Sequence, residues 1–151
     1  MSIRNRGVIG LTIAAALLVT GCGTVQATSG QPPAVVQVVP GSPVPQVRLT
    51  DQAIHRLGIV TQPVRVAAIT AAGRPGQYKV IPYSAVIYDN DGSTWTYMNT
   101  FARTFRRTRI TVRDIQGMTA VLTQGPAAGT QVVTVGAPEL LGTEYNISGE
   151  E

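Results

Sequence analysis

The stretch over residues 80–100 constrains the fold of this chain more than any other, because it reads as a β-hairpin. Two apolar runs rich in β-branched and aromatic residues are joined by Asp89-Asn90-Asp91-Gly92-Ser93. Turn-forming residues between two alternating runs are among the strongest local hairpin signals. We expect Trp95 and Tyr97 to share one face of the second strand and to lie in or beside the core; stacking on a ligand is the alternative.

The composition favours β structure, and the net charge of the chain is modest. Charged residues make up 13% of the chain and aromatic residues 5%, which is poor material for a helical bundle. The formal net charge is +4, but Arg4 and Arg6 lie in an N-terminal leader, and without them ten basic residues face eight acidic ones. An excess of two does not indicate a nucleic-acid partner. We predict a mainly β protein: a small β-roll or barrel-like domain with one or two short helices.

The N-terminus has the form of a signal peptide. Arg4 and Arg6 supply a short positive region, and residues 7–19 form an apolar run of 13 residues. A bilayer core requires about 20 apolar residues, so this run is too short to span it. We therefore expect export.

The next residues, Val19-Thr20-Gly21-Cys22, resemble the lipobox of bacterial lipoproteins. This resemblance implies removal of residues 1–21 and attachment of diacylglycerol and further acyl chains, such as palmitate, to Cys22. Several chains together give durable membrane anchoring, whereas one is marginal. Cys22 is the only cysteine, so no internal disulfide can form. We expect a lipid-anchored protein on the extracytoplasmic face of the cell membrane with no cofactor; an ordinary signal peptide or an anchor helix with an incidental cysteine is the alternative.

A linker is predicted over residues 22–46. It carries no charge and contains Pro32, Pro33, Pro40, Pro43 and Pro45. Such a composition favours extended, polyproline-like conformations over a packed core. Residues 34–39 are apolar and leave a second interpretation open, in which they add a strand to the domain.

The domain itself is predicted over residues 47–142, with a frayed tail over residues 143–151. Thr50 is expected to cap a short helix that Gly58 ends, with Ala53, Ile54 and Leu57 on one face. Strands are expected at residues 59–68, 109–113, 119–123 and 131–135, and a helical turn at residues 138–141.

No catalytic constellation is present in the sequence. His55 is the sole histidine, so a histidine metal site or a histidine-based triad has no second member. Asp89 and Asp91 suggest calcium, yet Ser93 and Thr100 stand where further acidic ligands would be expected. We predict neither an enzyme nor a metal site.

Five arginines fall within residues 101–113, and four of them are candidates for partner docking: Arg103, Arg106, Arg107 and Arg109. Arginine clusters of this kind suit anionic headgroups or an acidic protein surface. The alternative is a solvated strand face whose charges discourage pairing with other sheets.

Two blocks of the sequence resemble the membrane-proximal part of periplasmic adaptor proteins, also called membrane fusion proteins. These proteins serve resistance-nodulation-division pumps and some ABC exporters. The first block is Val47-Arg48-Leu49-Thr50 with Ala53-Ile54 and residues 57–61. The second comprises Ile81-Pro82, Ser84-Ala85-Val86, Thr94-Trp95-Thr96-Tyr97, Phe105-Arg106-Arg107, Ile110-Thr111-Val112, the turn at residues 125–129, Val132-Val133, Gly136-Ala137 and Glu139-Leu140-Leu141.

The resemblance implies a lipid-anchored accessory module that docks on a membrane transporter permease of the resistance-nodulation-division or ABC type. Full adaptors carry a lipoyl-like domain, usually a helical hairpin, and a β-barrel between these two blocks. Here about 15 residues, 66–80, separate them. The alternative function is a small surface lipoprotein that binds envelope components or a ligand and has no part in transport.

Overall fold

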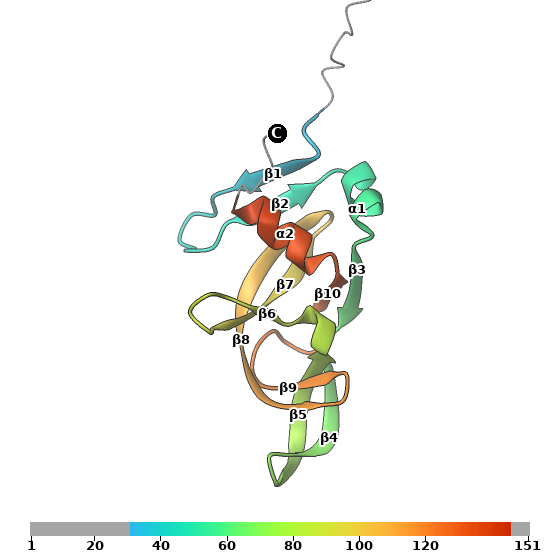
Figure 1. Ribbon diagram of the computed structural model, residues 1–151, viewed down its shortest axis with the longest axis vertical. Helices are drawn as coiled ribbons and strands as arrows, with labels where there is room; N and C mark the ends of the chain where they lie inside the picture. The colour runs from blue at the N-terminus through green and yellow to red at the C-terminus, as the bar shows by residue number, and fades with distance from the viewer. Residues whose placement is uncertain (1–30, 146–151) are drawn as a thin grey trace, which may run out of the picture. The chain divides into compact units, whose positions relative to one another are not determined.

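The computed structural model describes residues 31–145, which form one folded unit (Figure 1). Cys22 and the predicted leader lie outside the described residues. The described part contains ten strands and two α-helices, so the predicted mainly β fold with short helices is confirmed. The elements are β1 (Ala34–Gln37), β2 (Gln46–Leu49), α1 (Asp51–Leu57), β3 (Val60–Pro63), β4 (Arg65–Ala71), β5 (Arg74–Pro82), the 3-10 turn η1 (Tyr83–Ala85), β6 (Ile87–Tyr88), β7 (Thr94–Phe101), β8 (Thr104–Gln116), β9 (Thr119–Gln124), β10 (Gln131–Val135) and α2 (Ala137–Glu144).

The strands form one curled antiparallel sheet in the order β3-β10-β7-β8-β9-β5-β4, with β2 also on β8, β1 on β2 and β6 on β7. Strand β8 is 13 residues long and belongs to two regions of this sheet. Its first half pairs with β7, and its second half pairs with β9 after register shifts near Val112. We call the region around β7 and β10 the upper sheet, and the region of β4, β5 and β9 the lower sheet, as they stand in Figure 1.

Helix α1 forms as the sequence predicts. The Thr50 hydroxyl accepts a hydrogen bond from the Ala53 amide, and Gly58 adopts the left-handed conformation that ends the helix. Ala53 is buried, and Ile54 and Leu57 pack against the same core. The capping residues and the apolar spacing are both local signals, which is why the sequence is sufficient here.

The central hairpin is shorter than predicted. Only β6 pairs with β7 across the Asp89–Ser93 turn, with Ile87 opposite Trp95. The run before it is divided, because Pro82 ends β5 and η1 follows. Strand β5 instead pairs with β4 and β9, so the first predicted strand belongs to the lower sheet. The predicted alternation over residues 80–88 is therefore wrong.

The limits of the domain also differ from the prediction. Residues 34–37 pair with β2, so the open question of an added strand is answered in favour of a strand. Helix α2 continues to Glu144, beyond the predicted start of a frayed tail at residue 143. The predicted strand over residues 59–68 is interrupted at buried Val64, where the chain passes from the upper sheet to the lower.

Three buried clusters hold the fold together. Helix α2 covers one face of the upper sheet, and Leu140 there is 0% exposed against Tyr97 and Phe105. A second cluster joins the two sheets and includes Ile81, Ile110, Leu122 and Val132. A third, smaller cluster of Ala71, Val80 and Val121 lies inside the curl of the lower sheet. Apolar burial of this kind is the main force that favours folding.

Candidate functional site

The four arginines predicted to dock a partner do not form one surface. Arg103 lies in the β7–β8 turn with a positive φ of 62°, and its guanidinium is 2.8 Å from the Asp51 carboxylate. Arg106 and Arg107 are neighbours on β8 and therefore point to opposite faces of the sheet. Arg109 shares the face of Arg107 but is exposed.

Arg107 is held in a largely buried ion-pair network. Its Nη1 lies 2.9 Å from Asp89 Oδ2, and its Nε lies 2.8 Å from Glu144 Oε1. Only 12% of the Arg107 side chain and 3% of the Glu144 side chain are exposed. The Tyr97 hydroxyl donates to Glu144 Oε2 at 2.7 Å, so both carboxylate oxygens are used. The network ties β8 to α2 and to the β6–β7 turn.

Aromatic rings complete the surroundings of Arg107. The guanidinium carbon lies 4.7 Å from the centre of the Trp95 ring and 5.2 Å from that of Tyr145. Its carboxylate partners raise the pKa of Arg107 although burial opposes the charge. Burial, together with the bond to Glu144, raises the pKa of Tyr97, which therefore remains a neutral donor. The charge of Arg107 is thus satisfied within the domain.

The aspartates of the β6–β7 turn also have defined partners. Asp89 Oδ1 accepts the Asn90 amide and Asp91 Oδ1 accepts the Ser93 amide. These bonds, with Arg107 for Asp89 and the Ser93 side chain for Asp91, lower the pKa of both carboxyls. The two carboxylates serve the turn and Arg107. Among residues 31–145 no three His, Cys, Asp or Glu side chains gather as a metal site would require.

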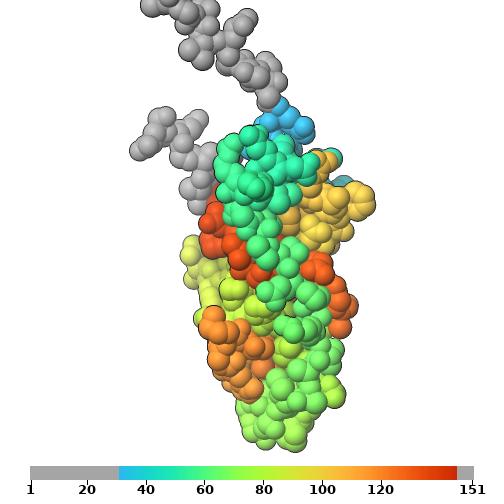
Figure 2. Space-filling view, turned by 90° about the vertical axis from the view of Figure 1, so that its right-hand side faces the viewer, coloured from blue at the N-terminus to red at the C-terminus, as the bar shows by residue number. Residues whose placement is uncertain are grey.

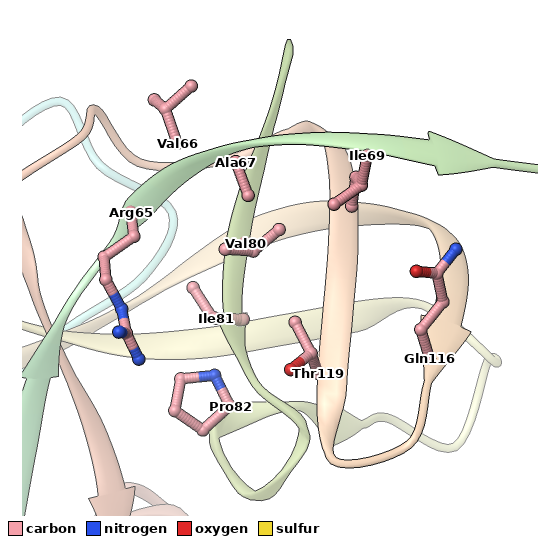
Figure 3. Close-up of a pocket in the computed structure, with 9 residues that line it drawn as sticks. All are labelled: Arg65, Val66, Ala67, Ile69, Val80, Ile81, Pro82, Gln116 and Thr119. Atoms are coloured by element: carbon pink, nitrogen blue, oxygen red, sulfur yellow. The ribbon is translucent and has the colours of Figure 1, made fainter. Parts of the chain in front are cut away.

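A hollow of about 410 Å³ opens on the inner face of the lower sheet (Figure 3). Ala67, Ile69 and Val80 form its apolar wall, and Arg65 and Thr119 stand at its margin. The register places these residues on one face, because Arg65 pairs with Val80 and Val80 with Val121. An apolar wall with a cation beside it suits a small amphipathic anion. The full lining is Arg65, Val66, Ala67, Ile69, Val80, Ile81, Pro82, Gln116 and Thr119.

Side chains from the end of β8 close the curl of the lower sheet against β4. Asp114 Oδ2 accepts the Ala72 amide at 3.1 Å, and Gln116 Nε2 donates to the Thr70 carbonyl at 2.7 Å. Arg113 Nε donates to the Ala71 carbonyl at 3.2 Å. The bonds to Asp114 lower the pKa of its carboxyl, with Gln116 the largest contributor. This β4–β8 seam was not predicted, because its residues are about 42 positions apart in the sequence and carry no local signal.

Comparison with protein-family models, with curated proteins and with solved structures found no match to this chain. Within residues 31–145, no helix has the length and apolar character needed to cross a membrane. His55 is exposed on α1 and takes no part in the ion pairs of Arg107. Cys22, the predicted lipidation site, lies outside the described residues.

Proposed function

We propose that this protein is a lipid-anchored extracytoplasmic accessory module that docks on a membrane transporter, in the manner of the membrane-proximal domain of periplasmic adaptors. The lipid on Cys22 would retain it at the membrane, and the β domain would contact the outer part of the transporter. No catalytic step is assigned to it.

The observation that carries this proposal is the way the two adaptor-like blocks combine. Strand β2, from the first block, pairs with β8 of the second through Val47 opposite Phe105. Strand β3 begins at Val60, within the first block, and pairs with β10 of the second. Adaptors form their membrane-proximal domain from the two ends of the chain, and the two blocks here share one sheet and one core in the same way.

The stretch between the blocks supports a reduced form of the adaptor role. Strands β4 and β5 form a hairpin turned by Ala72 and Gly73, where adaptors insert their further domains. Within residues 31–145 there is no long helical hairpin of the kind that reaches an outer-membrane channel. We therefore assign contact with the transporter itself and not a bridging role.

Arg106 and Arg109 are the predicted docking arginines that have no ion-pair partner among the described residues. They lie on opposite faces of β8, so they test two different surfaces. Arg107 is excluded from docking by its internal network, and Arg103 is tied to Asp51.

The test is crosslinking and affinity purification of the lipidated protein from native membranes, with mass spectrometry of what co-purifies. We expect a transporter permease in near-stoichiometric amount, lost with Cys22→Ala. Either Arg106→Gln or Arg109→Gln should reduce its recovery several-fold, while Arg74→Gln in the distant β4–β5 hairpin should not. Recovery of no transporter from membranes that retain the protein would contradict the proposal.

The hollow beside Arg65 favours a second candidate function, the binding of a small amphipathic anion by a lipoprotein with no role in transport. Its test is binding of a medium-chain fatty acid by calorimetry, with Arg65→Gln as the variant and Arg74→Gln as the control. Saturable binding that Arg65→Gln weakens about tenfold, a loss of about 1.4 kcal/mol, would favour this candidate. Absence of saturable binding would eliminate it for this ligand class.

A further inference from the structure

The β7–β8 turn lies at the same end of the folded unit as β1, where the described part of the chain begins. The Pro33 carbonyl, just before β1, accepts the Thr50 amide at the start of α1. The preceding amide, that of Leu49, donates to the Arg103 carbonyl in the β7–β8 turn at 2.9 Å. Figures 1 and 2 show β1, α1 and this turn at one end, with the β4–β5 hairpin at the other. We call it the entrance end.

An aromatic side chain projects from the entrance end. Phe101, the last residue of β7, is 77% exposed, although Phe105 of the same hairpin is buried. The register sets Thr104 opposite Phe101 on one side and opposite Arg48 on the other. Arg106 lies two residues farther along β8 and hence on the same face as Thr104. Arg48 and Arg106 are therefore both neighbours of Thr104, the residue that pairs with Phe101.

The entrance end is strongly basic for a protein of low net charge. Residues 31–57 and 100–106 contain Arg48, Arg56, Arg103 and Arg106 but only one acidic residue, Asp51, which gives a local charge of +3 with His55 neutral. Asp51 is paired with Arg103, so Arg48, Arg56 and Arg106 supply the excess. Arg48 and Arg56 are exposed, and Arg106 is half-buried.

The chain between Cys22 and β1 is short. Because β1 begins at Ala34, residues 23–33 alone separate it from the predicted lipid. At most about 3.6 Å per residue, this segment reaches about 40 Å when fully extended and less when it coils. A lipid on Cys22 would hold the entrance end at a high effective concentration near the bilayer surface.

We propose that the entrance end rests on anionic lipid headgroups, with Phe101 at the interfacial region and Arg48, Arg56 and Arg106 beside the phosphates. Arginines are attracted to an anionic leaflet, and an apolar Phe side chain can enter the boundary between headgroups and acyl chains. The inference rests on the lipidation of Cys22 that the proposed function includes. It goes beyond that function by fixing which end of the domain faces the membrane and which, with the β4–β5 hairpin, faces away.

The test uses the lipidated protein reconstituted into two kinds of vesicle, phosphatidylcholine alone and phosphatidylcholine with phosphatidylglycerol. The thioether consumes the Cys22 thiol, so an introduced cysteine is the only thiol available for a fluorescent label. Ala102→Cys places the label beside Phe101, and Gln77→Cys places it on β5 as the control. Nitroxide lipids then quench whichever label lies at the bilayer surface.

We expect quenching at position 102 to exceed that at position 77 several-fold in the anionic vesicles and to fall toward the control value in the neutral ones. High salt and the double variant Arg48→Gln/Arg106→Gln should each reduce it, since headgroup attraction is electrostatic. Phe101→Ser should reduce it as well. The matched change Met118→Ser removes an apolar side chain that is 74% exposed in the β8–β9 turn, and it should have no effect.

Equal quenching at the two positions, or quenching at 102 that is indifferent to phosphatidylglycerol, would overturn the proposal. Flotation of the vesicles is measured in parallel. Protein that floats but shows equal quenching refutes the docked orientation alone, whereas protein that does not float refutes the anchor on which the proposed function depends.

Discussion

Arg107 is the residue at which β8, α2 and the β6–β7 turn meet. Its ion pairs with Asp89 and Glu144 are largely shielded from water, and removing one partner of such a pair leaves an uncompensated buried charge. We expect Arg107→Ala to lower the free energy of unfolding by about 3 kcal/mol or more, measured by chemical denaturation followed through Trp95. Arg109→Gln, an exposed arginine on the same face, should change it by no more than about 0.5 kcal/mol.

The double variant Arg107→Met/Glu144→Leu separates pairing from packing. Because Glu144 also accepts the Tyr97 hydroxyl, this variant and Arg107→Ala are both compared in a Tyr97→Phe background. Only Asp89, whose side chain is 26% exposed, then loses a partner, so the destabilisation of the double variant should be smaller than that of Arg107→Ala. A double variant that is less stable than the single one would show that Arg107 contributes through packing against Trp95 and Tyr145.

Asp114 carries a pH dependence at the β4–β8 seam. Its bonds to Gln116 and to the amides of Ala72 and Ile115 lower the pKa of its carboxyl below the unfolded value of about 3.9. A group with a lowered folded pKa contributes stability above its unfolded pKa and loses it as pH falls through the folded pKa. We expect Asp114→Asn to reduce stability at pH 7 and to reduce the loss of stability below about pH 4, measured by thermal unfolding across pH. Asp89 titrates in the same window, so part of the acid loss should remain in the variant.

Among the candidate docking arginines, the sequence predicts which face of a strand a residue occupies but not which distant residues it contacts. The alternation of Arg109 with Ile110 was readable, and Ile110 is indeed buried. The partners of Arg107 are 18 and 37 positions away in the sequence. The sequence predicts a frayed tail at Glu144, so no local pattern identifies Arg107 as an internal residue.

At the scale of elements, two glycines with left-handed backbone end α1 and begin α2. A Cβ at Gly58 would meet open space, whereas one at Gly136 would lie 2.2 Å from the Ile59 side chain. We expect Gly58→Ala to cost about 1 kcal/mol from backbone strain alone. Gly136→Ala should cost that amount and about 1–3 kcal/mol more from overpacking.

Urea denaturation of both variants checks this difference. Gly136→Ala/Ile59→Ala removes the obstructing side chain and serves as the control, and Ile59→Ala alone supplies its baseline. Equal costs for Gly58→Ala and Gly136→Ala would mean that Ile59 moves aside freely.

Elements with complete local signals were predicted well, and those that depend on distant pairing were not. Helix α1 has its cap, its apolar face and its terminal glycine within nine residues, and β10 was predicted with its observed bounds. The run before the Asp89–Ser93 turn has equally strong β signals, yet Pro82 lacks an amide hydrogen and ends the strand there. Strand β5 pairs with β4 and β9, and nothing in residues 80–88 predicts either pairing.

For the whole molecule, β8 makes the three clusters interdependent. It contributes Phe105 to the cluster under α2 and Ile110 to the cluster between the sheets, and its far end closes the lower sheet against β4. A defect in one cluster therefore acts on the others through a shared strand. We expect the described domain to unfold as one cooperative unit.

Two matched substitutions test this cooperativity. Leu140 is on α2 and is buried in the cluster against which Trp95 packs. Leu122 is on β9 and is buried in the cluster that joins the two sheets. Each change to Ala should cost about 2–5 kcal/mol. Because unfolding is expected to be a single transition, each should shift the Trp95 fluorescence midpoint and the far-ultraviolet circular dichroism midpoint by the same amount. If Leu122→Ala moved the dichroism midpoint and left the Trp95 midpoint in place, the lower sheet would be a separate folding unit. The β4–β5 hairpin would then add little to the stability of the upper sheet.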